Sequence, residues 1–454
     1  MELFGTAGIR GDVGETVTPA LALQVGQATG AEAVAAADGE QVAFVVARDG
    51  RVTGEALVAA MVAGLESAGA DTVKVGQAAT PALAFASQGR YGVAITASHN
   101  PPTDNGIKLF HDGVEYSGAA ETRIEERVAA DHGPTEWDAW GSGEAAAVLP
   151  DYRDAVVEYA RELGAPLDGL EIVVDCGNGM ASTTTPAVLH ELGARVVTLN
   201  ANVDGHFPGR ESKPTAGTLG DCIAFLKEGS ADFGIAHDGD ADRIVILDSD
   251  GKVVHEDTVL AMLAEEYTRE SDAEDPVVVT TPNASARIDE RVREAGGHVE
   301  RVALGYLHDG IAEARADGGD VVFAAEPWKH VHTQFGGWID GVCSAAVLSR
   351  LFADSSLAAR REPISERPYR KVSVSCPDER KEATMADLAN TLPAAFPDAS
   401  VDDEYGVRLE LPDASWVLVR PSGTEPYLRI YAESDTVDKL VSSARDVVET
   451  AIDG

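Results

Sequence analysis

Residues 95–108 bring together side chains that can do chemistry. The Ser98 hydroxyl stands next to His99, and Lys108 follows ten residues later. A serine is a weak nucleophile by itself and needs a neighbouring base or a charged group to activate it. The apolar run at 91–95 predicts a buried strand, so Ser98 falls where a strand ends. That is the usual place for ligand-binding groups in an α/β sheet.

Proline and glycine residues set the conformation between Ser98 and Lys108. Pro101, Pro102 and Gly106 exclude a helix and predict an ordered loop that joins the two side chains. Most serines in loops only cap or close a turn. The case for a nucleophile at Ser98 therefore depends on the segments that follow it in the sequence.

Three carboxylates occupy alternate positions in the segment 238–243. Asp238, Asp240 and Asp242 can converge on one cation if the loop curls, and a ligand set made only of oxygen suits Mg²⁺ or Ca²⁺. The segment lies between apolar runs that predict two buried strands. Burying three carboxylates there without a cation costs several kcal/mol for each one. We therefore favour a metal site over a solvated acidic turn.

The spacing of these carboxylates is also that of the start of an EF-hand calcium loop. In an EF-hand a glycine at the sixth position and a glutamate at the twelfth complete the motif. This chain has Arg243 and Ser249 at those two positions. We therefore exclude an EF-hand and predict a different loop for a hard divalent cation.

A third segment, at 420–429, suits a phosphate dianion. Arg420 and Arg429 flank a Ser-Gly-Thr turn at 422–424. Backbone N–H groups, hydroxyls and guanidinium groups are the donors that hold a phosphate dianion in proteins. A plain hairpin turn would explain the glycine. It would not explain two arginines in a chain with so few basic residues, so we favour phosphate binding.

In this order along the chain, the three segments resemble those of the α-D-phosphohexomutase superfamily, which includes phosphoglucomutase, phosphomannomutase and phosphoglucosamine mutase. The opening Phe-Gly-Thr-Ala-Gly-Ile-Arg-Gly at 4–11 and Arg-Asp-Gly-Arg at 48–51 match as well, and the resemblance covers nearly the whole chain. It implies an isomerase that interconverts hexose 1-phosphate and hexose 6-phosphate through a phosphoserine enzyme and a bisphosphorylated sugar. The alternative within the superfamily is a phosphoglucosamine mutase.

The resemblance implies a carrier for the phosphoryl group and a metal site beside it. Ser98 would carry the group as phosphoserine. One Mg²⁺ would be held by Asp238, Asp240, Asp242 and a phosphate oxygen on Ser98.

It also implies roles for the basic residues. Arg10 and Arg243 would stabilise the oxygens of the transferred phosphoryl group, because this reaction depends on positioning and electrostatics. His99 and Lys108 are the candidates for the general base, and the sequence does not rank them. Further residues are expected to bind the sugar or its second phosphate, in addition to the loop at 325–330. They are Gly305, Arg420, Ser422, Gly423, Thr424 and Arg429.

The clearest departure from the family lies in the loop expected to bind the sugar. The superfamily usually has Gly-Glu-x-Ser-Gly-His, and this chain has Ala-Glu-Pro-Trp-Lys-His at 325–330. Glu326 and His330 keep their spacing and can bind sugar hydroxyls. Trp328 and Lys329 replace the serine and the glycine. The indole would either stack on the sugar or fill a gap between domains, and both roles stay open.

The net charge of −40 limits the possible partners. Acidic residues outnumber basic ones by 76 to 36, and only nine of the basic residues are lysines. Such a surface repels nucleic acid and anionic lipid. The ligands that the resemblance implies are hexose phosphates and a hexose bisphosphate. Many carboxylates with few lysines are typical of a protein that works in molar salt, where charges are screened. We infer a halophilic, haloarchaeal source and expect partial unfolding in dilute buffer.

Apolar runs and cysteines bear on the compartment. No run approaches the ~20 residues of a membrane span, and the first residues do not form a signal peptide. We expect a cytoplasmic enzyme, as a monomer or homodimer. The cysteines are far apart in the sequence, which indicates reduced, buried side chains at Cys176, Cys222, Cys343 and Cys376.

Strand and helix patterns alternate along most of the chain. Up to about residue 360 this pattern is typical of α/β units, and the remainder has several strands followed by a helix. We predict an α/β protein with three related mixed-sheet domains and a C-terminal α+β domain around a central cleft, as the resemblance implies. The expected domains are 1–140 with the serine loop, 150–252 with the metal loop, 253–360 with the sugar loop and 368–454 with the phosphate loop.

Two other classes of function fit parts of the sequence. A Mg²⁺-dependent phosphatase would use similar carboxylates, but usually with an aspartate nucleophile and without a distal phosphate site. A sugar-phosphate sensor would keep the cleft and lose turnover. The retained Ser98 and the complete acidic segment at 238–243 argue against a sensor.

Overall fold

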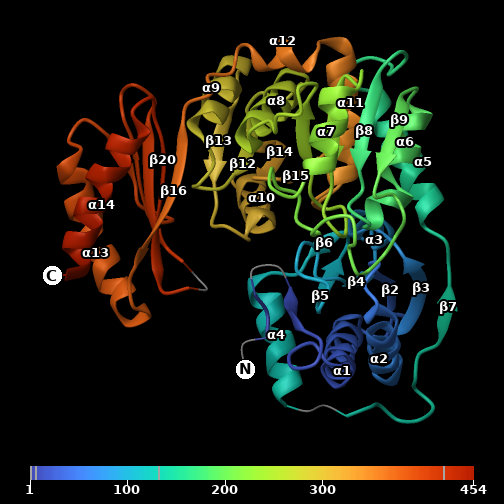
Figure 1. Ribbon diagram of the computed structural model, residues 1–454. Coiled ribbons are helices and arrows are strands. Elements are labelled where there is room, and N and C mark those ends of the chain that lie inside the picture. The colour runs from blue at the N-terminus through green and yellow to red at the C-terminus, as the bar shows by residue number, and fades with distance from the viewer. Residues whose placement is uncertain (1–2, 6–7, 131–132, 423–424, 454) are drawn as a thin grey trace. The chain divides into compact units, whose positions relative to one another are not determined.

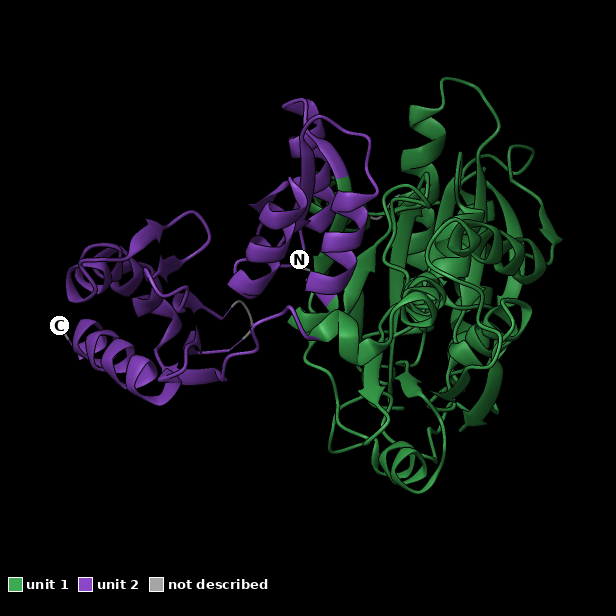
Figure 2. Cartoon of the chain, turned by 90° about the horizontal axis from the view of Figure 1, so that it is seen from above, with its two compact units in different colours: residues 1–259, 322–361 green, residues 260–321, 362–454 purple. Residues whose placement is uncertain are grey.

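The computed structural model describes residues 3–5, 8–130, 133–422 and 425–453 (Figure 1). Gly423 and Thr424, both expected in the phosphate turn, lie outside the described residues. The chain forms two compact units: Met1–Val259 with Val322–Arg361, and Leu260–Val321 with Glu362–Gly454 (Figure 2). The range 253–360 expected for a third domain contributes to both units. The domain boundaries stay a prediction.

The first unit begins with a mixed sheet and its helices. The strands are β1 (Ile9–Asp12), β2 (Ala43–Arg48), β3 (Asp71–Gln77), β4 (Tyr91–Ile95), β5 (Asp104–His111), β6 (Val114–Glu115) and β7 (Gly143–Ala145). The helices are α1 (Pro19–Ala36), α2 (Gly54–Ser67), α3 (Thr80–Ala86) and α4 (Gly118–Ala129). The strand order is β1-β5-β4-β2-β3-β7, with β6 paired to β5. Strands β4, β2, β3 and β7 are parallel, and β5 is antiparallel to β4 and β1.

The chain after Ser98 differs in part from the predicted loop. Gly106 and Lys108 lie inside β5, where Lys108 pairs with Ala94 of β4. A Cβ on Gly106 would lie 2.4 Å from the carbonyl oxygen of Thr96. The glycine is therefore required by the close approach of two backbones rather than by a turn.

A second mixed sheet in the first unit carries the acidic segment. Its strands are β8 (Glu171–Asp175), β9 (Arg195–Leu199), β10 (Phe233–Ala236) and β11 (Val245–Asp248), in the order β11-β10-β8-β9, and only β11 is antiparallel. The helices that follow or precede these strands are α5 (Leu149–Arg161), the 3₁₀ helix η1 (Met180–Thr183), α6 (Thr185–Glu191) and α7 (Gly220–Glu228). All four residues of β10 are buried, as expected for a central strand.

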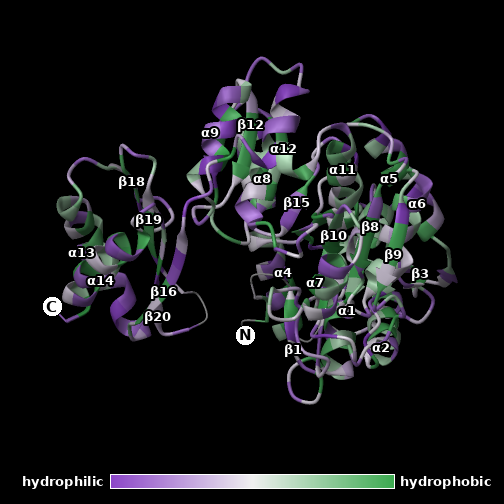
Figure 3. Cartoon of the chain, turned by 45° about the horizontal axis from the view of Figure 1, so that its top comes forward, coloured by the Kyte–Doolittle hydropathy of each residue, from purple (hydrophilic) through white to green (hydrophobic). Residues whose placement is uncertain are grey.

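An antiparallel hairpin and two helices complete this unit. They are β14 (Asp320–Glu326), β15 (Lys329–Val331), α11 (Gly341–Asp354) and α12 (Leu357–Arg361). Figure 3 shows α11 largely in the hydrophobic colours, and twelve of its residues are buried. A helix with apolar residues all round belongs in a core.

The second unit contains two kinds of layer. Parallel strands β12 (Pro276–Thr280) and β13 (His298–Arg301) occur with α8 (Glu256–Arg269), α9 (Ala286–Ala295) and α10 (Leu307–Ala316). The C-terminal part has strands β16 (Tyr369–Ser375), β17 (Ser400–Asp402), β18 (Val407–Glu410), β19 (Trp416–Pro421) and β20 (Tyr427–Glu433), with α13 (Asp378–Ala395) and α14 (Val437–Asp453). This sheet is antiparallel throughout, in the order β16-β20-β19-β18-β17.

These mixed α/β sheets and the C-terminal antiparallel sheet confirm the predicted fold class. The four cysteines are free and buried, as expected. Among the described residues no helix is both long and apolar enough to cross a membrane.

Candidate active site

The reactive serine lies at the end of a buried strand. Ser98 follows β4, is fully buried, and has a φ of +50°, a conformation that side chains other than glycine rarely adopt. Its backbone N–H donates to the Thr96 hydroxyl over 2.9 Å. Strain of this kind at a serine is typical of functional sites, where the surrounding structure holds it in place.

The acidic segment approaches Ser98 from the second sheet. It follows β10, and a Cβ on Gly239 would lie 2.6 Å from the Ser98 carbonyl oxygen, so only glycine allows this approach. The Ser98 Oγ donates a hydrogen bond of 2.6 Å to Asp238 Oδ2. Two residues 140 positions apart in the sequence thus share one hydrogen bond.

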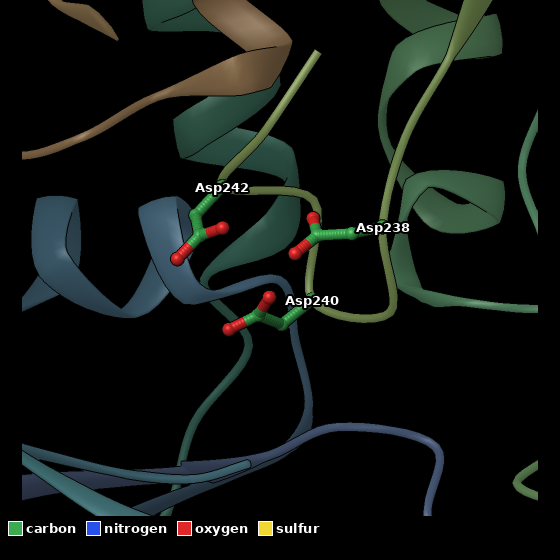
Figure 4. A group of neighbouring side chains, drawn as sticks. All are labelled: Asp238, Asp240 and Asp242. Carbon is green, nitrogen blue, oxygen red and sulfur yellow. The ribbon is translucent and has the colours of Figure 1, made fainter. Parts of the chain in front are cut away.

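The three aspartates converge as the sequence predicted. Oxygens of Asp238, Asp240 and Asp242 lie within 4.8 Å of one another, and the side chains point toward a common centre (Figure 4). All three residues are buried, with at most 2% of their surface exposed. Thr80 Oγ1 donates to Asp240 over 2.6 Å, and Lys108 Nζ donates to Asp242 over 3.0 Å.

Two carboxylate oxygens of this cluster have no hydrogen-bond partner among the described residues. They are Asp240 Oδ1 and Asp242 Oδ1, and both are buried. Burial, Asp242 and Asp240 together raise the pKa of Asp238 well above its usual value. Buried carboxylates with unsatisfied oxygens fit a hard divalent cation, which would supply the missing positive charge.

The two candidates for the general base have different surroundings. His99 Nδ1 lies 3.3 Å from Ser98 Oγ. Burial, followed by the charges of Arg243 and Arg10, lowers the pKa of His99 to about 2. Burial opposes the charge of Lys108, but its carboxylate neighbours, including Asp242, raise its pKa. The histidine is therefore the neutral member of the pair.

The two arginines expected beside the phosphoryl group are both in the first unit. Arg243 Nε lies 3.8 Å from one oxygen each of Asp238 and Asp242. Arg10 is in β1, and its buried Nε has no hydrogen-bond partner among the described residues. Both charges lower the pKa of His99, and Arg10 pairs with Gly106 of β5.

Arg51 is a structural residue of the site that sequence reasoning noted only as part of a motif. Its fully buried guanidinium donates to the carbonyl oxygens of Ser98 and three neighbours in the same loop, Asn100, Pro101 and Asp104. It also pairs with Asp49 at 3.0 Å. One planar group with several donors thus holds the serine loop in its strained conformation. Neither Arg51 nor Thr80 has a spacing in the sequence that reveals these contacts.

The expected sugar loop is a tight hairpin attached to the acidic segment. Glu326 and Lys329 pair across the strands β14 and β15, and Trp328 has a φ of +72°. The Ile244 N–H donates to the Trp328 carbonyl over 3.3 Å, and Arg243 forms a backbone bridge with Lys329. The indole packs against apolar residues of the second sheet, and this contact supports the gap-filling role over stacking on a sugar.

His330 is held below this turn in one orientation. Its Nδ1 lies 2.9 Å from the Ser344 hydroxyl, and its buried Nε2 has no hydrogen-bond partner among the described residues. Burial lowers the pKa of His330 to about 3, so the ring is neutral near pH 7. Together with Glu326, it offers polar groups that suit sugar hydroxyls.

The second unit contains the arginines expected to bind phosphate. Arg420 and Arg429 pair across β19 and β20, and Lys381 Nζ donates to the carbonyl oxygens of Ser422 and Glu425 over 2.7 Å each. Lys381 is a further residue of this turn that the sequence did not indicate. Gly305, with a φ of +88°, lies in this unit before α10.

Three family models match the chain. They are described as phosphoglucomutase/phosphomannomutase α/β/α domain I at residues 1–133, α/β/α domain II at 150–251, and the C-terminal domain at 372–450. These matches cover well over half of the chain. Their positions agree with the serine loop, the acidic segment and the arginine turn described above.

Relatives over the full length support the same assignment. A phosphopentomutase of Thermococcus kodakarensis is 40% identical over 464 residues, covering 100% of this chain and 99% of that protein. A probable phosphoglucosamine mutase of Methanopyrus kandleri is 41% identical over 467 residues, covering 99% and 97%. The crystal structure of a phosphoglucomutase/phosphomannomutase family protein from Burkholderia thailandensis has a TM-score of 0.86 at 28% identity, covering 99% and 97%.

Proposed function

Because the chain belongs to the phosphoglucomutase/phosphomannomutase family of the α-D-phosphohexomutase superfamily, and is therefore a phosphohexomutase and an isomerase, we propose that Ser98 is its phosphoryl carrier. Phosphoserine would donate its phosphoryl group to the free hydroxyl of a hexose monophosphate, which forms a hexose bisphosphate. After the sugar turns round, its other phosphoryl group would return to Ser98. Hexose 1-phosphate and hexose 6-phosphate are thereby interconverted.

The observation that carries this proposal is the Ser98 hydroxyl bonded to Asp238, next to two buried carboxylate oxygens without partners. Asp238, Asp240 and Asp242, with an oxygen on Ser98, would hold one Mg²⁺. This ion supplies positive charge to a transferring phosphoryl group. Arg10 and Arg243 would add further positive charge at the same group.

His99, as a neutral imidazole, would accept a hydrogen bond from the reacting hydroxyl. Its ring nitrogen is within 3.3 Å of Ser98 Oγ, whereas Lys108 is bound to Asp242 at 3.0 Å and to Glu115 at 3.5 Å. Lys108 would therefore act as a fixed positive charge that orients Asp242. Arg420, Ser422 and Arg429, with Gly423 and Thr424, would hold the phosphate that is not transferred.

The sugar would be bound by Glu326, His330 and Gly305. The names of the relatives suggest two further classes of substrate for this enzyme. Several archaeal relatives carry the name probable phosphoglucosamine mutase, which supports an amino sugar as the alternative substrate. The Thermococcus relative is named phosphopentomutase, which supports a pentose phosphate as a second candidate.

The test is turnover of the 1-phosphates of glucose, mannose, glucosamine and ribose, with Mg²⁺ in concentrated KCl. Wild type should convert at least one of them, and Ser98→Ala should lose that activity. Ser249→Ala, at an exposed position, is the matched control and should keep it. A fully active Ser98→Ala enzyme would rule out the phosphoserine proposal.

A further inference from the structure

The hairpin between β14 and β15 ends in a half-buried ion pair, next to the acidic segment in the fold. Lys329 Nζ lies 3.1 Å from Glu326 Oε2, and only 15% and 12% of the two side chains are exposed. The two residues are direct cross-strand partners, so the backbone itself brings the charges together. Lysine is rare in this chain, which has nine, and this one lies in the loop proposed to bind the sugar.

The turn that presents this pair is fixed in place. Pro327 and Trp328 occupy the two central positions, and the positive φ at the second of them normally requires glycine or asparagine. Packing of the Trp328 indole against the second sheet and the bond from Ile244 N–H hold the strained turn. The Lys329 ammonium is therefore presented at a defined position, and not at the end of a mobile loop.

The position of Lys329 is close to the reaction centre. Its backbone bridges to Arg243, the residue that follows the three aspartates. Arg243 Nε in turn lies 3.8 Å from one oxygen each of Asp238 and Asp242. A sugar that offers a hydroxyl to Ser98 must therefore lie within the field of Lys329.

Resting on the proposed function, we propose that Lys329 is a specificity-determining residue that selects neutral sugar phosphates against amino sugar phosphates. Glu326 is the acceptor that would otherwise attract a sugar ammonium. Since it already holds Lys329, a second ammonium gains little from Glu326 and is repelled by Lys329. A neutral hydroxyl meets neither effect.

The experiment compares glucose 6-phosphate with glucosamine 6-phosphate, by calorimetric affinity and by kcat/KM, for wild type and Lys329→Met. Wild type should prefer the neutral sugar by roughly tenfold or more at about pH 6.5. Lys329→Met removes the repelling ammonium and should reduce this preference roughly tenfold. Lys329→Arg keeps the charge and should retain it. The control Lys252→Met, at an exposed position, should match wild type.

Measurements at a series of pH values distinguish an effect of the charge of the amino sugar from an effect of its shape. An ammonium of this type titrates at about 8, so the wild-type preference should narrow as the amino sugar loses its charge toward about pH 9. If Lys329→Met does not fold, Glu326→Gln is the second variant. It leaves the ammonium of Lys329 without its counter-ion and should strengthen the preference against the amino sugar.

Equal ratios of affinity in wild type, Lys329→Met and Glu326→Gln at both pH values would overturn the role of Lys329. Failure of the proposed function is a different result, namely absence of turnover of every sugar phosphate by folded, Ser98-phosphorylated enzyme. The affinity ratios test Lys329 in either case.

Discussion

The serine and aspartate loops of the first unit and the arginine turn of the second unit are built differently. Ser98 and the three aspartates are almost completely buried. Ser98 donates to Asp238, and Thr80 and Lys108 donate to Asp240 and Asp242. The turn after β19 is more open, since Pro421, Glu425 and Pro426 are exposed. Its Arg429 pairs with Glu425 and its Arg420 contacts Tyr431 at 3.1 Å.

This difference matches two different tasks. Groups that stabilise charge during phosphoryl transfer act best when they are fixed and shielded from water, because reorganisation is then small. A phosphate anchor binds substrate and product alike. Its arginine donors must be able to release a protein carboxylate, here Glu425, and bind the substrate phosphate instead. The first region should therefore determine kcat, and the second should determine KM.

Loss of one metal-loop carboxylate should give the largest effect. Asp240→Asn should lower kcat roughly 10²–10³-fold, because a fixed electrostatic group is removed from the transition state. The same change should raise the melting temperature of metal-free protein, because it removes one of three buried like charges. Kinetics and melting curves with and without Mg²⁺ check both, with the exposed Asp250→Asn as control. An unchanged kcat would contradict the proposed metal site.

Loss of an anchor arginine should act on binding. Arg420→Ala should raise KM for the sugar phosphate about tenfold to a hundredfold with a smaller change in kcat, since hydrogen bonds to charged groups contribute about 1.5–3 kcal/mol. Arg445→Ala on α14 is the control, because that arginine is exposed and pairs with Glu449 of the same helix. A fall in kcat at constant KM would contradict the assignment of substrate binding to the arginine turn.

The pH dependence of stability should report the buried His330. Its pKa is lowered from 6.5 to about 3, so its contribution is complete above about pH 6.5 and is lost as the pH falls toward 3. His330→Gln cannot titrate, and its stability deficit relative to wild type should shrink over that range. Urea unfolding at a series of pH values measures the difference.

Salt should have the mildest and most general effect. With a net charge of −40, screening should raise the melting temperature between dilute buffer and molar KCl. The same salt should weaken sugar phosphate binding at the open arginine turn more than it changes kcat at the buried centre. Equal melting temperatures at low and high KCl would contradict the hypothesis that the protein is halophilic.

Much of the site follows from local sequence. The residue types in 95–108, 238–243 and 420–429, and the apolar strands before them, predicted a candidate nucleophile, a metal loop and a phosphate turn, and the family resemblance implied that Ser98 is the phosphoryl carrier. They did so because strand ends are where backbone groups and side chains are free to bind ligands. Gly106 and Lys108 were expected in a loop and lie in β5, because ladder bonds to β4 and β1 decide that conformation.

The sequence alone therefore determined the chemical groups, the order in which they occur and the fold class. Only the tertiary structure decided their partners: Arg51 on four carbonyl oxygens of the serine loop, and Lys329 on Glu326 rather than in solvent. It also distinguished His99 from Lys108, since Lys108 meets two carboxylates there and His99 meets two arginines. The reason is physical. The protonation state and the hydrogen bonds of a side chain depend on its burial and on its distance to neighbouring groups. Those neighbours are far apart along the chain and come together only after the strands have paired.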